Sequence, residues 1–247
     1  MNRKIVYGYV WETGTVKKSN EDSLLLRTVK TKNGSLLMGC ICDGMGGIGN
    51  GETASGYIAE QLEKWLFQEC LPAIKRSKSP IVIKGKGFRF FQKVNRQLFE
   101  HMRQKAVPLG TTASLLILFG DWGYLFHIGD SRIYRLGSYP LLKKSVFVKQ
   151  LTKDHKKDES TLTRCLGLTP KWEPDFFRFR IGKGPCGFLL CSDGFYRKLE
   201  QKQLQYLSPK LLKDGRHIER RLKEIAERIK KKGEPDNLSA LYIKLES

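Results

Sequence analysis

Acidic residues in this chain repeatedly stand where an apolar run meets glycine. The clearest case is Asp43, which follows the apolar run 36–42 and precedes glycines at 44, 46, 47, 49 and 51. The run predicts a buried strand, and the glycines let the backbone approach a ligand closely. From Glu52 the apolar residues recur at helical spacing. We therefore expect Asp43 to lie between the end of a strand and the start of a helix.

Four more acids share the position at one end of an apolar run: Asp22, Asp130, Asp193 and Asp236. Each one alone predicts only a turn, but together they predict a carboxylate cluster. Carboxylates with only four histidines in the chain suit magnesium or manganese better than zinc. Two such ions about 3.5–4 Å apart can share a carboxylate and activate a water that attacks phosphorus. The predicted chemistry is metal-assisted phosphoryl hydrolysis.

A dinucleotide site is the first alternative, because Gly44, Gly46 and Gly49 fit GxGxxG between an expected strand and an expected helix. Asp43 would place a negative charge beside the pyrophosphate of such a ligand. No clear second strand ending in an acid follows the helix, as that fold requires. We regard a dinucleotide-dependent oxidoreductase as a distant alternative.

A cysteine-dependent phosphatase loop is the second alternative, because residues 191–197 fit C-x5-R. Asp193 in the middle of that loop would repel a phosphate dianion, so we interpret Cys191 as a strand residue. We interpret His127 and His155 as structural.

The elements that must position these acids can be read from the periodicity of the chain. Strands are expected at 5–11, after Asp22, at 36–42, 111–119, 124–128, 146–151, 176–181, 187–191 and 238–245, and helices from 52, at 88–105 and at 216–231. Residues 72–87 look like a connector with a short strand at 81–83, and residues 120–123 like a hairpin turn. Paired strands and paired helices favour an α+β protein with mostly antiparallel sheets.

The composition is that of one globular domain, which we place at residues 1–247. Hydrophobic residues make up 40% and charged residues 28%, whereas the formal net charge of +20 is unusual and favours anionic partners. The six cysteines form no CxxC pair and are expected to be reduced. No signal peptide or membrane span is apparent, which favours a cytoplasmic protein.

Seven motifs occur in the order and rough spacing of a known family: DGMGGIGNGETAS, GTTAS, HIGDSRIYR, QLTKDH, LTRCLG, LLCSDGF and PDNLSAL. With them the chain resembles, over nearly its whole length, the metal-dependent serine/threonine protein phosphatases of the PP2C or PPM family, especially the bacterial branch. The resemblance implies a four-layer αββα sandwich, in which two mostly antiparallel sheets are flanked by helix pairs. It also implies a metal cleft at one end.

The resemblance implies a role for each matching residue. Asp43 bridges two core Mn²⁺ or Mg²⁺ ions, and the Gly44 carbonyl holds the first. Asp193 and Asp236 bind the second ion, and Asp130 holds a weaker third one. The nucleophile is then a metal-bound water rather than a side chain.

Other positions match the family pattern less closely. In the acid pair of the N-terminal motif, we assign Asp22 to the metal cluster and leave Glu21 as a direct or water-mediated partner. Lys17 replaces the arginine that grips the substrate phosphate in many relatives, and Met45 replaces the histidine of eukaryotic members. Only 156–161 remain where relatives carry a longer flap, so we expect a shortened flap and an open, weakly selective cleft.

The expected function is hydrolysis of phosphoserine and phosphothreonine in proteins. The expected partners are a serine/threonine kinase and its substrates, with no specific nucleic acid, and the chain is expected to be a monomer. The alternative is a catalytically weak or inactive regulatory module on the same fold.

Overall fold

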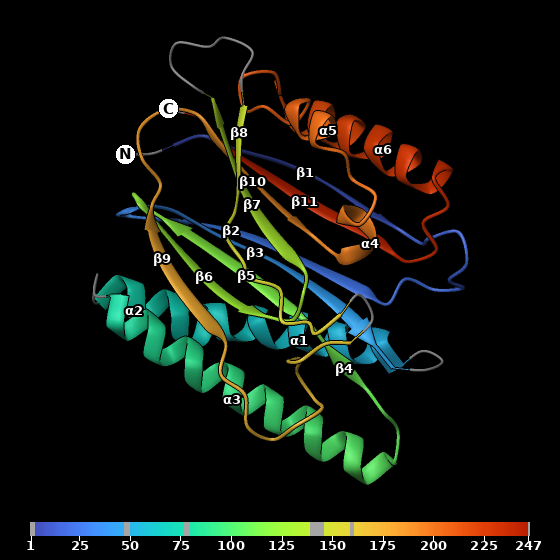
Figure 1. Cartoon of the computed structure of the whole chain (residues 1–247). Coiled ribbons are helices and arrows are strands. Elements are labelled where there is room, and N and C mark those ends of the chain that lie inside the picture. Colours follow the sequence, from blue (N-terminus) through green and yellow to red (C-terminus); the bar gives the residue numbers. More distant parts are fainter. Residues whose placement is uncertain (1–2, 47–49, 77–79, 139–145, 159–160, 247) are drawn as a thin grey trace.

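The computed structural model describes residues 3–46, 50–76, 80–138, 146–158 and 161–246. Two antiparallel sheets lie face to face, and helices cover the outer face of each (Figure 1). This arrangement confirms the predicted α+β sandwich. Every strand pair in the described part of the chain is antiparallel, which excludes the parallel sheet of a dinucleotide-binding fold.

The first sheet contains both the first and the last strand of the fold. Its order is β1 (Ile5–Glu12), β11 (Leu238–Leu245), β10 (Cys186–Cys191), β7 (Arg132–Ser138) and β8 (Val146–Gln150). β1 pairs with β11 over its whole length, from Ile5 opposite Leu245 to Glu12 opposite Leu238. The strands nearest the two ends of the described chain are therefore paired with each other at one edge of this sheet.

The second sheet has the order β2 (Asp22–Thr31), β3 (Gly34–Met45), β5 (Ala113–Phe119), β6 (Trp122–Ile128) and β9 (Asp175–Arg180). The short strand β4 (Gly110–Thr111) also pairs with the end of β3. In the register of β2 and β3, Asp22 lies directly opposite Asp43. The sheet thus brings together two acids that lie twenty-one positions apart in the sequence.

Helices α1 (Asn50–Trp65), α2 (Leu71–Arg76) and α3 (Pro80–Lys105) cover the second sheet, with a π-helical turn at Leu66–Cys70 between α1 and α2. Helices α4 (Asp193–Tyr196), α5 (Gln201–Gln205) and α6 (Gly215–Lys231) lie over the first sheet. Ile218, Leu222, Ile225 and Ile229 are the buried stripe of α6, as their spacing predicts.

Three hydrophobic layers hold the sandwich together. One lies between α1, α3 and the second sheet, one between the two sheets, and one between α6 and the first sheet. Phe91, Ile41 and Leu222 are fully buried representatives of the three layers. Burial of apolar surface in these layers is the main force that fixes the sheet ends in which the acids lie.

The predicted connector at 72–87 is wrong, because most of it is helical. Pro80 is the first residue of α3, where a missing N–H costs nothing and the fixed φ favours a helix. Gly87 lies inside α3, and a Cβ there would come within 2.2 Å of the Phe126 ring. This glycine therefore marks a close contact between helix and sheet rather than a loop, and the proposed strand at 81–83 does not form.

The hairpin between β5 and β6 has a shorter turn than predicted. Phe119 pairs with Trp122, so only Gly120 and Asp121 form the turn. Gly120 has a φ of +59°, which favours glycine. Trp122 and Gly123 thus belong to β6.

All six cysteines are buried and free, as expected. Among the described residues, no helix has both the length and the apolar composition needed to cross a membrane.

Candidate metal centre

Asp43 is fixed near the end of β3 by its neighbour Thr112. The Asp43 N–H donates to Thr112 Oγ1 at 2.9 Å, and the Thr112 N–H donates to the Asp43 carbonyl at 2.9 Å. The next residue, Gly44, has no room for a side chain, because a Cβ would lie 2.1 Å from the Gly51 carbonyl oxygen and 2.4 Å from that of Glu21. Three backbone segments therefore meet beside Asp43 at a distance that only glycine permits.

Three other acids reach the same place from separate elements. Asp130 follows β6 and Gly129, which has a φ of +107°. Asp193 begins α4 directly after β10, and Asp236 precedes β11. Oxygen atoms of Asp43, Asp130 and Asp193 lie within 4.8 Å of one another, and Asp236 lines the same cleft. The structure thus brings together in one cleft four of the five aspartates that the sequence placed at strand ends.

The acid pair before β2 divides between two positions. Glu21 lines the cleft, and its carboxylate accepts a hydrogen bond from Lys17 Nζ at 2.7 Å. Asp22 is buried beside Asp43 as its cross-strand partner and does not line the cleft. The Asp22 Oδ2 atom has no hydrogen-bond partner among the described residues.

Burial and mutual repulsion raise the pKa values of the carboxylates in this cluster. Burial, followed by the charges of Asp193 and Asp22, raises the pKa of Asp43 well above its usual value. Burial is also the largest cause of the raised pKa of Asp130, to about 6, and of Asp22, to about 7. Like charges placed opposite one another on a sheet destabilise it. The fold therefore contains an electrostatic cost that a bound cation would remove.

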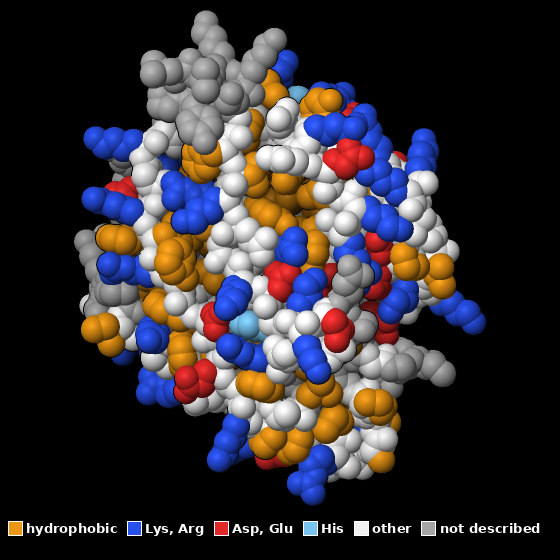
Figure 2. Space-filling view, viewed as in Figure 1, with side chains coloured by type: hydrophobic (Ala, Val, Ile, Leu, Met, Phe, Trp, Pro, Cys, Tyr) orange, Lys and Arg blue, Asp and Glu red, His pale blue; other side chains and the backbone are white. Residues whose placement is uncertain are grey.

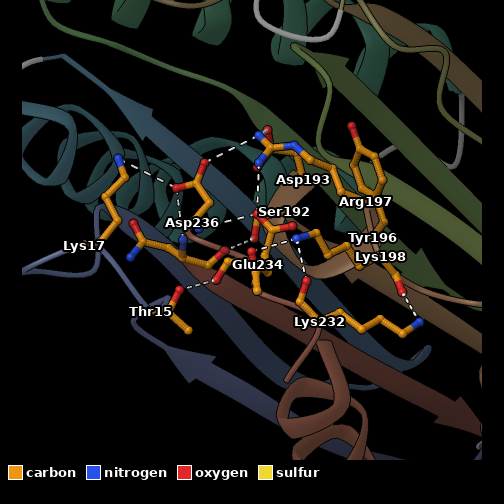
Figure 3. Close-up of polar contacts among 12 residues, drawn as sticks. Thr15, Lys17, Ser192, Asp193, Tyr196, Arg197, Lys198, Lys232, Glu234 and Asp236 are labelled. Atoms are coloured by element: carbon orange, nitrogen blue, oxygen red, sulfur yellow. Dashed lines mark hydrogen bonds and ion pairs between the residues drawn. The ribbon is translucent and has the colours of Figure 1, made fainter. Parts of the chain in front are cut away.

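Arg197 supplies positive charge on one side of the cluster. Its guanidinium pairs with Asp193, with Glu234 at 3.1 Å and with Asp236 at 3.4 Å. Lys17 approaches Asp236 to 3.7 Å from the other side. Figure 3 shows Asp236 between the two cations, with Glu234 beneath it. Glu234 is buried, so it anchors Arg197 while the rest of the guanidinium faces the carboxylates.

The acids and cations line a cleft of about 620 Å³. Figure 2 shows Asp and Glu side chains interspersed among the Lys and Arg side chains on one face of the molecule. Lys156, Thr161, Leu162 and Leu168 form its other wall, and Met45 also lines it. Lys156 and Leu162 are joined by an isolated antiparallel bridge. This bridge brings together the two sides of the segment for which we predict a shortened flap. Residues 159 and 160 of that segment lie outside the described residues.

Two contacts of the site were not predicted from the sequence. Asn237 accepts a hydrogen bond from the Glu21 N–H at 2.9 Å and donates to the Ser19 carbonyl at 3.1 Å, so it joins β11 to the N-terminal acid pair. Arg197 is the second contact, and the C-x5-R pattern that contains it does not predict its place beside the acids. Its spacing of four residues after Asp193 was a signal for the ion pair, because such residues face each other on a helix.

The two histidines and the cysteine that the sequence predicts to be structural lie among residues outside the acid cluster. His127 is buried between Ser114 Oγ and the Lys153 carbonyl oxygen, at 2.9 and 3.0 Å. His155 pairs with Asp175 at 3.0 Å. Cys191 is the buried last residue of β10, and burial raises the pKa of its thiol, which disfavours the thiolate that a nucleophile needs.

The donor set fits hard divalent cations. It consists of carboxylate oxygens with Gly44 beside them, and no cysteine or histidine lines the cleft among the described residues. The unpartnered Asp22 Oδ2 next to the cluster and the burial that raises the pKa of Asp43 both favour a bound cation.

Comparison with known proteins agrees with this geometry. The family model of Protein phosphatase 2C matches residues 15–241. A candidate protein phosphatase from Mycoplasma pneumoniae is 27% identical over 214 residues, which cover 76% of this chain and 77% of that protein.

Solved structures of bacterial phosphatases share the fold. A bacterial serine phosphatase superposes with a TM-score of 0.80 at 20% identity, and 99% of each chain is covered. The serine/threonine phosphatase Stp1 from Staphylococcus aureus has a TM-score of 0.78 at 19% identity over 100% of this chain and 96% of Stp1. The catalytic domain of the serine/threonine protein phosphatase PstP, solved with two manganese ions, has a TM-score of 0.73 at 24% identity over 99% of this chain and 100% of that domain.

Proposed function

The chain belongs to the protein phosphatase 2C family, and from this premise we propose that it hydrolyses phosphoserine and phosphothreonine in proteins with the help of Mn²⁺ or Mg²⁺. The observation that carries the proposal is the meeting of Asp43, Asp130 and Asp193 oxygens within 4.8 Å at the bottom of a cleft. Residues 1–247 then act as one phosphatase domain.

In this proposal Asp43 and the Gly44 carbonyl would hold a first ion, and Asp43, Asp193 and Asp236 would hold a second. Asp130 is assigned to a third, weaker site. When bound, such ions supply a water activated for attack on phosphorus and neutralise the charge that develops there. We keep Asp22 in the metal cluster as the buried neighbour whose negative charge helps to raise the pKa of Asp43. Glu21, which faces the cleft, is the member of the pair that can contact an ion or its water.

The substrate phosphate faces a second set of residues. Lys17 Nζ lies in the cleft, within 3.7 Å of Asp236, and offers a point charge to the phosphate. Its side chain is 40% exposed, so it can turn from the carboxylates toward a substrate. No histidine lines the cleft within the described residues, and we assign protonation of the leaving alcohol to solvent.

The decisive assay is manganese-dependent hydrolysis of a phosphothreonine peptide by the purified protein. Asp43→Ala removes the ligand shared by both core ions and is expected to lower kcat by several orders of magnitude without a matching change in KM. Asp130→Ala is expected to retain the core ions and still turn over more slowly. Full activity of Asp130→Ala at limiting manganese would disprove the third site.

An inactive regulatory module is the outcome that would replace this proposal. Calorimetry would then show manganese binding to the wild-type protein while no phosphopeptide is hydrolysed.

We further propose that the protein acts in the cytoplasm as a monomer, on phosphorylated proteins that include a serine/threonine kinase and its substrates.

A further inference from the structure

A second concave surface lies close to the cleft, between α3 and the segment that leads to β9. We call it the basic groove; it has a volume of about 600 Å³ and is lined by Arg89, Gln92, Lys93, Arg96, Pro170, Lys171, Trp172 and Glu173. Four of these side chains are cations and one is an acid. The α3 residues are spaced so that they share one face of the helix. Figure 1 shows the segment before β9 running beside α3.

The cations of the groove are largely unneutralised. Arg96 pairs with Glu100 at 3.5 Å. Arg89, Lys93 and Lys171 are exposed and have no carboxylate partner within the described residues. Unpaired charges that line a concave surface reinforce one another's field more than charges on a convex surface do. The groove is therefore suited to an anionic ligand.

The groove has fixed walls. Asn95 is fully buried on α3, and its side chain donates to the Thr169 carbonyl at 2.8 Å and accepts from the Gly167 N–H at 2.9 Å. Leu166 exchanges two backbone hydrogen bonds with Thr111, at 3.1 and 2.9 Å. The segment 166–169 is thus anchored to both the helix and the sheet. Little of the binding free energy of a ligand would therefore be lost in ordering this segment.

The same segment joins the groove to the cleft. Leu168 lines the cleft and Pro170 lines the groove. Two residues span at most roughly 7 Å between Cα atoms. An extended peptide advances about 3.3 Å per residue, so a peptide whose phosphorylated residue lies in the cleft would need only a few further residues to reach the groove.

We propose that the basic groove binds the acidic flank of a phosphoprotein substrate and so selects substrates that carry Asp or Glu near the phosphorylated residue. This inference rests on the proposed phosphatase function. The chemistry recognised is a run of carboxylates on an extended chain. A nucleic acid is disfavoured, because Trp172 is the one aromatic residue among those that line the groove and no series of stacking rings is available.

The test compares two variants that each lose three positive charges. The groove variant is Arg89→Gln, Lys93→Gln, Lys171→Gln. The control variant is Lys213→Gln, Arg220→Gln, Lys223→Gln, which removes exposed cations at and beside α6, in the opposite outer layer. Three phosphothreonine peptides of equal length are used, with neutral flanks, with glutamates on the N-terminal side, or with glutamates on the C-terminal side.

We expect the wild-type protein to prefer one acidic peptide over the neutral one by about tenfold in kcat/KM at low salt, because each exposed charge contact changes affinity by roughly two- to fivefold. The preference should fall as salt shortens the range of the field. The groove variant should lose most of it through KM, and the control variant should keep it. Equal losses in the two variants, or an unchanged preference in the groove variant, would overturn the proposal.

A binding measurement separates this proposal from the proposed activity. Fluorescence anisotropy of a labelled glutamate-rich peptide without phosphate requires no turnover. We expect the groove variant to bind it at least fivefold more weakly than the control variant. Equal binding by both variants, or tighter binding of a labelled single-stranded RNA that depends on the same cations, would refute the groove even if the protein is an active phosphatase.

Discussion

Replacing Asp43 by asparagine is expected to make the metal-free protein more stable while it destroys the metal centre. Asp43 has other carboxylate oxygens within 4.8 Å, and Asp22 lies opposite it on the neighbouring strand. Two unit charges at that distance repel by about 1 kcal/mol in water and by about 3 kcal/mol at an effective dielectric constant of about 20. Arg197 offsets part of this repulsion. We therefore expect the free energy of unfolding in chelator to rise by about 1–3 kcal/mol.

The measurement is thermal unfolding at pH 8, once with chelator and once with excess manganese. In a domain of this size the gain corresponds to a Tm increase of about 3–10 °C for Asp43→Asn in chelator. With manganese the order should reverse, because under the proposed assignment the variant loses a ligand of both core ions and with it the stabilisation that binding them provides. The advantage of the variant should shrink as the pH falls, since the raised pKa of Asp43 means that this carboxyl is protonated at a higher pH than an ordinary one. A variant that is less stable than the wild-type protein in chelator would refute the argument.

Three further predictions concern the charged groups around the cluster. Arg197→Gln should tighten manganese binding in calorimetry by roughly 5- to 30-fold, because a half-exposed cation near Asp236 competes by about 1–2 kcal/mol; weaker binding would show that Arg197 orients the ligands instead. Lys17→Arg should be tolerated and Lys17→Ala should mainly raise KM, whereas an unchanged KM in Lys17→Ala would remove this residue from the phosphate site. Burial lowers the pKa of His127 to about 4. Between pH 6.5 and 4 this histidine is therefore protonated in the unfolded chain but neutral in the folded one, and the free energy of unfolding should fall by up to about 3 kcal/mol as the pH is lowered through this range. His127→Gln should flatten that part of a urea-unfolding pH profile, and an unchanged slope would contradict the assignment.

The sequence predicted best those features that depend on neighbouring residues. The last strand has the predicted bounds, Leu238–Leu245, because an apolar run between PDN and the final acid leaves little choice. The aspartates could be grouped from the sequence because each one lies at the end of an apolar run. The end of the strand is then enough to place the residue at the cleft. Local pattern and tertiary structure agree at these positions.

Features that depend on tertiary contact could not be predicted in this way. Gly87 resembles a loop residue until the Phe126 ring is seen against it. The alternation of side chains along a strand says that Glu21 and Asp22 face different ways, but not which one reaches the cleft. Arg197 and Glu234 lie far apart in the sequence, and only the packing of α4 beside the start of β11 joins them.

The pairing of β1 with β11 has a consequence for how this protein is made. During synthesis Ile5 leaves the ribosome long before Leu245, the residue with which it pairs in the folded protein. Until then β1 and β10 have open edges, which are templates for unwanted pairing with other chains. Contacts of such long sequence separation also form slowly, and partly folded chains that expose them need chaperones. Because Asp236 lies two residues before the same late strand, it is held beside the other aspartates only once β11 has paired.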